Sequence, residues 1–126
     1  MAFCIYLQTT AVRSRFLEIH NFIRKGREMF INMSNFQPKA GQEAKLKEMF
    51  VNQVLPITLG TKGLVSADVV ISADGVITNL ERWESEAAWK ELTHAFTARK
   101  DLMDELQAIV EKFWEYPVTL LKEFKA

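Results

Sequence analysis

The sequence is poor in the features that mark several common classes of protein. Cysteine occurs once, at Cys4, among 126 residues, which excludes an internal disulfide framework and favours a reducing compartment. Sixteen Lys and Arg residues balance sixteen Asp and Glu residues, so no basic excess is available for binding nucleic acid. No apolar run approaches the roughly 20 residues that span a bilayer. The sequence therefore predicts a cytoplasmic protein with no nucleic-acid partner and no stable membrane insertion.

Residues 1–28 differ in charge from the rest of the chain. They carry five basic and two acidic residues, a net charge of +3, whereas the remainder carries eleven basic and fourteen acidic residues, a net charge of −3. Phe16, Ile19 and Ile23 recur at helical spacing, so we expect an N-terminal extension that is helical and packs on the domain. A helix on a membrane surface, an organelle transit peptide and an extension upstream of a true start at Met29 are the alternatives.

Residues 29–126 show one series of strand and helix patterns, which fits a single domain. Side chains that alternate in polarity predict strands, and apolar side chains that recur every three or four residues predict helices. Asp74-Gly75 marks a tight turn between the second and third strands, and Ser85 is suited to cap the helix that follows. The expected strands are Phe30–Gln37, Leu64–Ser72, Val76–Trp83 and Val118–Phe124. The expected helices run from Gln42 to a break at Pro56, from Ser85 to Phe96, and over Ala98–Glu115.

This order of elements predicts an α+β fold, the ferredoxin-like split βαβ arrangement. In that fold a four-stranded antiparallel sheet carries helices on one face only. The other face of the sheet must be covered, and a second copy of the chain covers it most economically. We therefore expect a homodimer in which sheet packs on sheet.

The stretch from Val76 to Phe96 holds the densest group of side chains suited to chemistry. Asn79, Glu81 and Trp83 share one face of the expected strand, because successive strand side chains point to opposite sides. The amide of Asn79 and the indole N–H of Trp83 can both donate hydrogen bonds into one cleft. The same spacing also fits a Trp83 that is an ordinary core aromatic. Glu81 fits either a general base or an ion-pair partner on the neighbouring strand.

Three segments carry a resemblance to a known family. They are FQPKAGQEAKLKEMF, VLPITLGTKGLVSADV and NLERWESEAAWKELTHAF. The most specific part is the strand-to-helix junction Glu81-Arg82-Trp83-Glu84-Ser85, followed by Ala87, Trp89, His94 and Phe96. With the order of elements, these segments resemble the antibiotic biosynthesis monooxygenase superfamily over about Met29–Phe124. The resemblance implies a dimeric α/β barrel of ferredoxin-like halves.

The resemblance also implies an activity and a set of site residues. The polyketide oxygenases of the superfamily are similar where an asparagine stands four residues before the tryptophan, here Asn79 and Trp83. Their aromatic hydroxyl residue six positions after the tryptophan is replaced by Trp89. We expect a monooxygenase without metal or flavin that oxidises a small electron-rich phenol, hydroquinone or polyketide-type aromatic with O2. Its catalytic residues would be Asn79, Trp83 and His94, and its substrate-binding residues would be Phe36, Met49, Phe50, Trp89 and Phe96.

Two other functions are compatible with the same resemblance. The haem-degrading members are similar in a strand tryptophan and a histidine on the next helix, here Trp83 and His94, which makes haem the alternative cofactor. They also use an asparagine on the first strand, for which Asn32 and Asn35 are candidates. His94 follows Trp89 by five positions, roughly 140° around an ideal helix, which favours an exposed side chain. The last hypothesis is a non-enzymatic small-molecule-binding stress-response module of the same fold.

Overall fold

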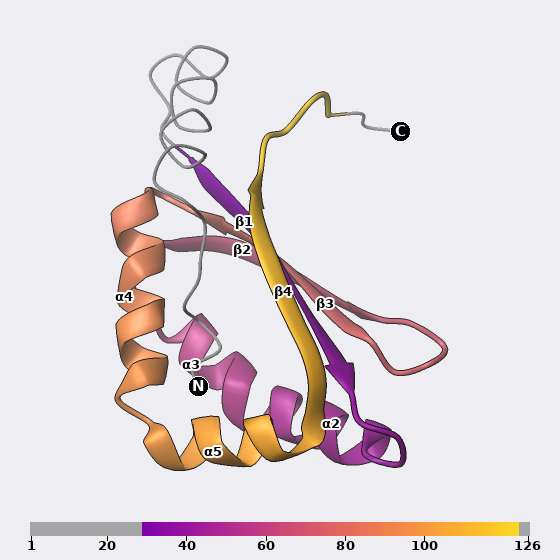
Figure 1. Ribbon diagram of the computed structural model, residues 1–126. Helices are drawn as coiled ribbons and strands as arrows, with labels where there is room; N and C mark the ends of the chain where they lie inside the picture. The colour runs from indigo at the N-terminus through magenta and orange to yellow at the C-terminus, as the bar shows by residue number, and fades with distance from the viewer. Residues whose placement is uncertain (1–28, 124–126) are drawn as a thin grey trace.

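The computed structural model describes residues 29–123, so the helix expected within residues 1–28 lies outside the described part. Figure 1 shows the strands and helices of this part of the chain. In order they are β1 (Phe30–Pro38), α2 (Glu43–Met49), the π-helix η1 (Phe50–Val54), α3 (Leu55–Leu59), β2 (Leu64–Ile71), β3 (Ile77–Trp83), α4 (Glu86–Thr97), α5 (Lys100–Ile109) and β4 (Val110–Val118).

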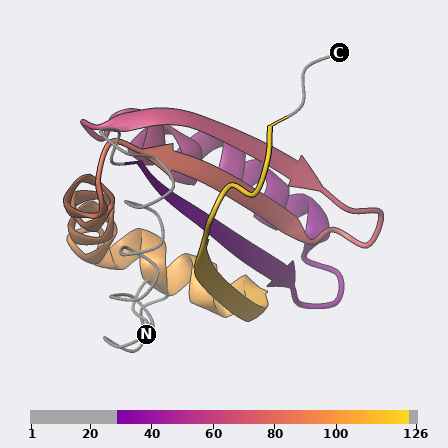
Figure 2. The same cartoon turned by 90° about the horizontal axis from the view of Figure 1, so that it is seen from above.

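The four strands form one antiparallel sheet in the order β2-β3-β1-β4. β1 pairs with β3 on one side and with β4 on the other. The described helices all lie against one face of this sheet (Figure 1, Figure 2). The predicted ferredoxin-like fold is therefore confirmed, whereas the homodimer stays a prediction.

The first helical segment changes type just before its proline. The sequence predicts that Pro56 ends or kinks this helix. In the structure α2 passes into the π-helix η1, and α3 then carries Pro56 in its first turn, where a missing backbone N–H does least harm. The segment ends at Leu59 and turns three side chains, Phe50, Val54 and Thr58, toward the pocket described below.

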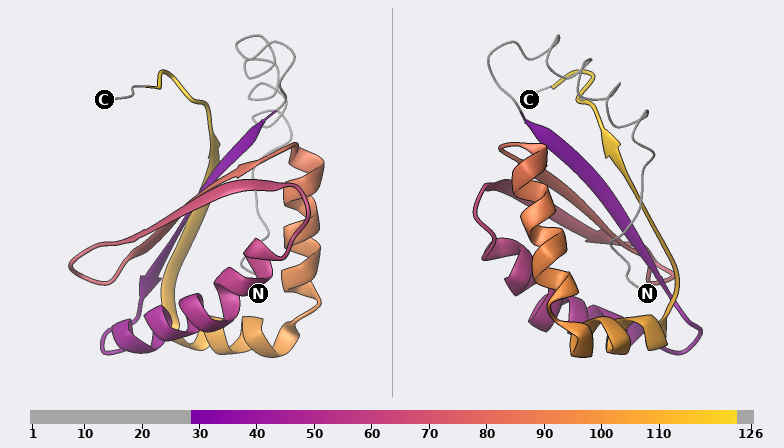
Figure 3. Two further views of the ribbon diagram at one scale, coloured as in Figure 1. Left: turned by 180° about the vertical axis from the view of Figure 1, so that it is seen from behind. Right: turned by 60° about the vertical axis from the view of Figure 1, so that its left-hand side comes forward.

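The hairpin and the helix cap follow the local sequence signals. Ser72 N–H donates to the Val76 carbonyl at 2.9 Å, and Gly75 adopts a φ of +90°, which confirms the tight turn. The Ser85 hydroxyl accepts a hydrogen bond from Ala88 N–H at 3.1 Å, which confirms the predicted N-cap of α4. The β2–β3 hairpin projects beyond the helices (Figure 3).

The last helix and the last strand do not follow the prediction. The helix expected over Ala98–Glu115 is wrong beyond Ile109, where α5 ends, and the expected strand Val118–Phe124 is wrong because Val118 ends β4. The helix begins after Arg99, without a side-chain cap.

Sheet pairing explains this difference. The apolar helical spacing continues into Phe113 and Trp114, but these residues pair with Phe36 and Asn35 of β1. Backbone pairing along β1, together with the strand preference of aromatic residues, outweighs the local periodicity. Pro117 is tolerated because β4 lies at the edge of the sheet.

Buried apolar side chains form two clusters between the sheet and the helices. The larger cluster includes Phe36 and Phe50 and involves α2, η1 and α5. The smaller one surrounds Trp83 and joins Phe30 to Trp89 of α4, with ring centroids 5.2 Å apart. Members of both clusters line one pocket.

Candidate active site

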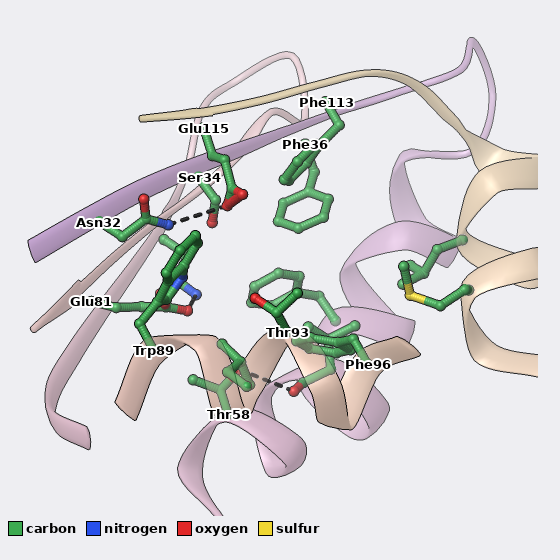
Figure 4. Close-up of a pocket in the computed structure, with 16 residues that line it drawn as sticks. Asn32, Ser34, Phe36, Thr58, Glu81, Trp89, Thr93, Phe96, Phe113 and Glu115 are labelled. Atoms are coloured by element: carbon green, nitrogen blue, oxygen red, sulfur yellow. Dashed lines mark hydrogen bonds between the residues drawn. The ribbon is translucent and has the colours of Figure 1, made fainter. Parts of the chain in front are cut away.

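The pocket lies between the inner face of the sheet and the helices (Figure 4). Its empty volume, open solvent at the mouth included, is about 520 Å³. Aromatic rings supply much of its wall, namely Phe36, Phe50, Trp89, Phe96 and Phe113. Polar side chains from the sheet gather at one end, namely Asn32, Ser34, Asn79, Glu81 and Glu115. We call this group the polar end.

Strand alternation and register assemble the polar end. Asn32 and Ser34 of β1, Asn79 and Glu81 of β3, and Glu115 of β4 all face the helices because they occupy alternate positions of their strands. Asn32 pairs with Glu81 across β1 and β3, and Ser34 pairs with both Asn79 and Glu115. Neighbouring pairs in a sheet are close enough for their side chains to interact.

Glu81 is the central group of the polar end. Its side chain is 3% exposed. Asn79 Nδ2 donates to one carboxylate oxygen at 2.6 Å, and Trp83 Nε1 donates to the other at 3.0 Å. The two hydrogen bonds fix the orientation of the carboxylate inside the protein.

The environment of Glu81 raises the pKa of its carboxyl group from 4.5 to about 7. Desolvation by burial is the largest cause, because a charged carboxylate is disfavoured away from water. The hydrogen bond from Trp83 lowers the pKa, the negative charge of Glu115 raises it, and the hydrogen bond from Asn79 lowers it. At neutral pH roughly half of the Glu81 carboxyl groups are ionised, as suits a general base.

Each of the two asparagines of the polar end donates a side-chain hydrogen bond to a carboxylate. Asn32 Nδ2 donates to Glu115 Oε1 at 3.2 Å, as Asn79 Nδ2 does to Glu81. The Oδ1 atoms of Asn32 and Asn79 are buried and have no hydrogen-bond partner within residues 29–123. Buried acceptors without a partner are uncommon in native proteins and mark a place where function is worth seeking.

The structure brings together most of the residues expected to bind substrate. Phe36, Phe50, Trp89 and Phe96 line the pocket, together with Asn79. Met49 instead lies in the larger core cluster, 2% exposed, and is not among the lining residues.

The other two expected catalytic residues lie outside the cavity wall. Trp83 is fully buried, and its indole N–H donates to Glu81 rather than into the pocket. The side chain of His94 is 72% exposed on α4, with Nδ1 3.4 Å from Glu91. In this arrangement Trp83 can influence a bound ligand through its hydrogen bond to Glu81. The sequence also allows an ion pair between Glu81 and the neighbouring strand. In the structure Glu81 instead accepts hydrogen bonds from Asn79 and Trp83.

Two pocket residues, Phe113 and Glu115, are not among those that the sequence predicts. The sequence pattern places both in a helix, whereas β4 turns them toward the pocket. The signal that identifies them is the strand-forming composition of FWEYPV, which is rich in aromatic residues and has a proline as its last residue but one. Asn32, which entered only as a candidate for the haem-degrading alternative, is the residue that contacts Glu115.

The lining residues do not provide the ligand that the haem alternative requires. No histidine, cysteine or tyrosine belongs to the described pocket wall, and proximal haem ligands are most often of these types. Within residues 29–123 no group of three or more His, Cys, Asp and Glu side chains is placed to hold a metal ion. No described helix is both long enough and apolar enough to cross a membrane.

Comparison with known families decides the classification. The model of the family described as antibiotic biosynthesis monooxygenase matches residues 29–112. The chain belongs to this antibiotic biosynthesis monooxygenase (ABM) family. The matched residues include β1 and β3, and therefore Asn32, Asn79, Glu81 and Trp83. A comparison with curated protein sequences gave no match.

Solved structures show the same fold at low sequence identity. The monooxygenase from the ActVA-Orf6 gene of Streptomyces coelicolor, in complex with nanaomycin D, is 21% identical, with a TM-score of 0.63 over 82% of this chain and 97% of that one. SnoaB, a cofactor-independent oxygenase from Streptomyces nogalater, is 14% identical, with a TM-score of 0.65 over 79% and 99%. Rv0793 from Mycobacterium tuberculosis is 18% identical, with a TM-score of 0.62 over 78% and 100%. These three structures support the fold of this chain.

Proposed function

We propose that this ABM-family protein is a monooxygenase that oxidises an electron-rich phenol or hydroquinone with O2 and uses neither metal nor flavin. The observation that carries the proposal is the buried Glu81 carboxylate, held by Asn79 and Trp83 at the polar end of an aromatic pocket. Membership of the family and the fold shared with a cofactor-independent oxygenase support it.

The first step is a proton transfer from a substrate hydroxyl to Glu81. The O–H bond breaks, the proton moves to a carboxylate oxygen, and the negative charge moves to the aromatic ring system. A free phenol has a pKa near 10 and the Glu81 carboxyl group a pKa of about 7, so the proton transfer costs free energy. Binding the substrate hydroxyl against Glu81, away from water, can offset this cost. The protonated Glu81 can then donate its O–H back to the phenolate oxygen.

The second step uses the substrate itself as the reductant. The phenolate transfers one electron to O2, and the phenoxyl radical and superoxide combine to a peroxide anion at a ring carbon that carries a hydrogen. This anion takes the proton held by Glu81 and becomes a hydroperoxide. Loss of water from the hydroperoxide gives a quinone, so one oxygen atom of O2 enters the product and the other leaves as water. The aromatic wall, which includes Phe36, Phe50 and Phe113, limits the access of water to the reactive intermediates.

Oxygen uptake tests the proposal. The protein, freed of metal by a chelator, is mixed with a panel of hydroquinones and anthrone-like phenols, and consumption of O2 is followed with an electrode. We expect uptake above the buffer rate and one labelled oxygen atom in the product when 18O2 is supplied. The Glu81→Gln variant should lose about 100-fold or more of the rate, whereas Glu105→Gln, which neutralises an exposed carboxylate on α5, should not. Wild-type protein that consumes no O2 with any member of the panel would contradict the proposal.

A binding module without catalysis is the competing function for the same pocket. It predicts that the panel binds without O2 uptake, so the two measurements together separate the hypotheses. No described histidine lies in the pocket, and we therefore do not propose haem degradation.

A further inference from the structure

The polar end has a consistent electrical character within the described part of the chain. The lining residues contribute two carboxyl groups, from Glu81 and Glu115, and no lysine, arginine or histidine. One side-chain N–H group each of Asn32 and Asn79 already donates to these carboxyl groups. What the polar end offers to a ligand is therefore mainly hydrogen-bond acceptors and negative charge.

Two further observations point to a ligand rather than to a structural cluster. Asn32 and Asn79 are 1% and 2% exposed, line the pocket, and each keep a buried Oδ1 without a hydrogen-bond partner within residues 29–123. Leaving such acceptors unsatisfied costs free energy, which a ligand hydroxyl can recover. The two asparagines occupy neighbouring cross-strand pairs of β1 and β3, Asn32 with Glu81 and Asn79 with Ser34.

We infer that the polar end selects neutral aromatic ligands that carry at least two hydroxyl donors, and that it rejects both the oxidised quinone form and carboxylated analogues. The inference deepens the proposed function by naming the substrate class of the same site. Asn32, Asn79 and Glu81 are its specificity-determining residues, and Glu115 adds the charge that repels anions.

Each half of this selectivity has its own physical cause. A quinone presents only carbonyl oxygens, so at the Oδ1 atoms of Asn32 and Asn79 acceptor would face acceptor and both buried oxygens would stay without a partner. A ligand carboxylate would lie near Glu115 and an ionised Glu81, and like charges in a partly desolvated site repel each other. A neutral hydroquinone meets neither penalty. The proposed oxygen insertion converts it to a hydroxyquinone, which keeps one hydroxyl donor in place of two, so the product loses part of these contacts and is released more easily.

Binding under nitrogen tests the inference without any oxidation. The ligands are 1,4-dihydroxynaphthalene, 1,4-naphthoquinone and 1,4-dihydroxy-2-naphthoate, and their affinities for the full chain are measured by equilibrium dialysis at pH 8. We expect the quinone and the carboxylate each to bind about tenfold more weakly than the neutral diol, or weaker still.

Matched variants assign the effect to the polar end. Glu115→Gln keeps an oxygen for the Asn32 amide and removes a charge, so it should raise the affinity of the carboxylate relative to that of the diol. Glu105→Gln removes the same charge from the exposed face of α5 and should leave the order of affinities unchanged. Melting curves establish that each variant is folded.

The inference is overturned by any of three results. They are a quinone or carboxylate that binds wild type as tightly as the diol, a Glu105→Gln variant that gains carboxylate affinity as Glu115→Gln does, and a folded protein that binds none of the three ligands. The outcome is separate from the oxygen-uptake test. A protein that prefers the diol but never consumes O2 would keep this inference and contradict the proposed reaction.

Discussion

Asn79 Nδ2 lies 2.6 Å from a carboxylate oxygen of Glu81, two residues further along the same face of β3. The sequence pattern pairs Asn79 with Trp83 as two donors to a substrate, but in the structure both donate to the carboxylate that stands between them. The motif thus presents an oriented, buried carboxyl group rather than two free N–H groups. This relationship determines the first two predictions below.

The stability of the protein should fall as the pH rises from 4 to 8, because of Glu81. Its pKa is about 7 in the folded chain and near 4.5 when unfolded, so the folded state holds the proton more tightly. The stabilisation is fully present below pH 4.5 and is lost as pH rises through 7, by about 3 kcal/mol in total. Urea unfolding of wild type and Glu81→Gln at each pH measures the difference between them, which cancels the other titrating groups. Parallel pH profiles for the two proteins would contradict the buried-carboxyl assignment.

Replacing Trp83 by phenylalanine should move the activity profile to higher pH. The indole hydrogen bond lowers the pKa of Glu81, so its loss raises that pKa above about 7 and the base form appears later in a titration. We also expect a loss of about 1–3 kcal/mol of stability from the removed hydrogen bond and ring volume. The measurement is the pH dependence of O2 uptake.

Trp114→Phe is the matched control for this shift. Trp114 lies on the opposite face of the sheet from Phe113 and Glu115, which line the pocket. The Trp114→Phe substitution should leave the pH dependence of O2 uptake unchanged. An equal shift in the two variants would mean that tryptophan loss acts through general destabilisation rather than through Glu81.

His94→Ala should change neither stability nor O2 uptake appreciably. The side chain is 72% exposed and lies outside the pocket wall, and exposed substitutions of this kind usually stay within about 0.5 kcal/mol. Titration with haemin provides a second readout. We expect wild type and the variant to give the same Soret spectrum, whereas a band present only in wild type would revive the haem alternative.

Homodimer formation is the remaining prediction about assembly. The face of the sheet away from the helices exposes Val70, at 61%, and Tyr116, at 44%, because both alternate with the positions that face the helices. A second copy packed there would cover both. Sedimentation should give about twice the 14.5 kDa mass of one chain. Val70→Lys should weaken this dimer, because packing would bury the added charge.

Val51→Lys offers a control of similar exposure. Val51 is 52% exposed on η1, on the helical side of the molecule, so the same substitution there should leave the dimer intact. Wild-type protein that sediments as a monomer at micromolar concentration would contradict the sheet-on-sheet arrangement.

Local sequence signals determined much of the fold. Alternation placed Asn79, Glu81 and Trp83 on one face of β3, and Ser85 and Gly75 set a helix cap and a turn. The strand face, the helix cap and the turn each depend on residues that are neighbours in the chain, and the sequence therefore predicts them.

Only the tertiary structure decided which side chains meet in the pocket and what the pKa of Glu81 is. Glu115 reaches the pocket because β4 pairs with β1 across more than seventy residues of sequence, and that pairing overrode a helical pattern. The pKa of Glu81 rises because packing removes water and brings Glu115 near. Periodicity reports which side of an element is apolar, whereas burial and charge proximity depend on contacts between distant segments, which no local pattern contains.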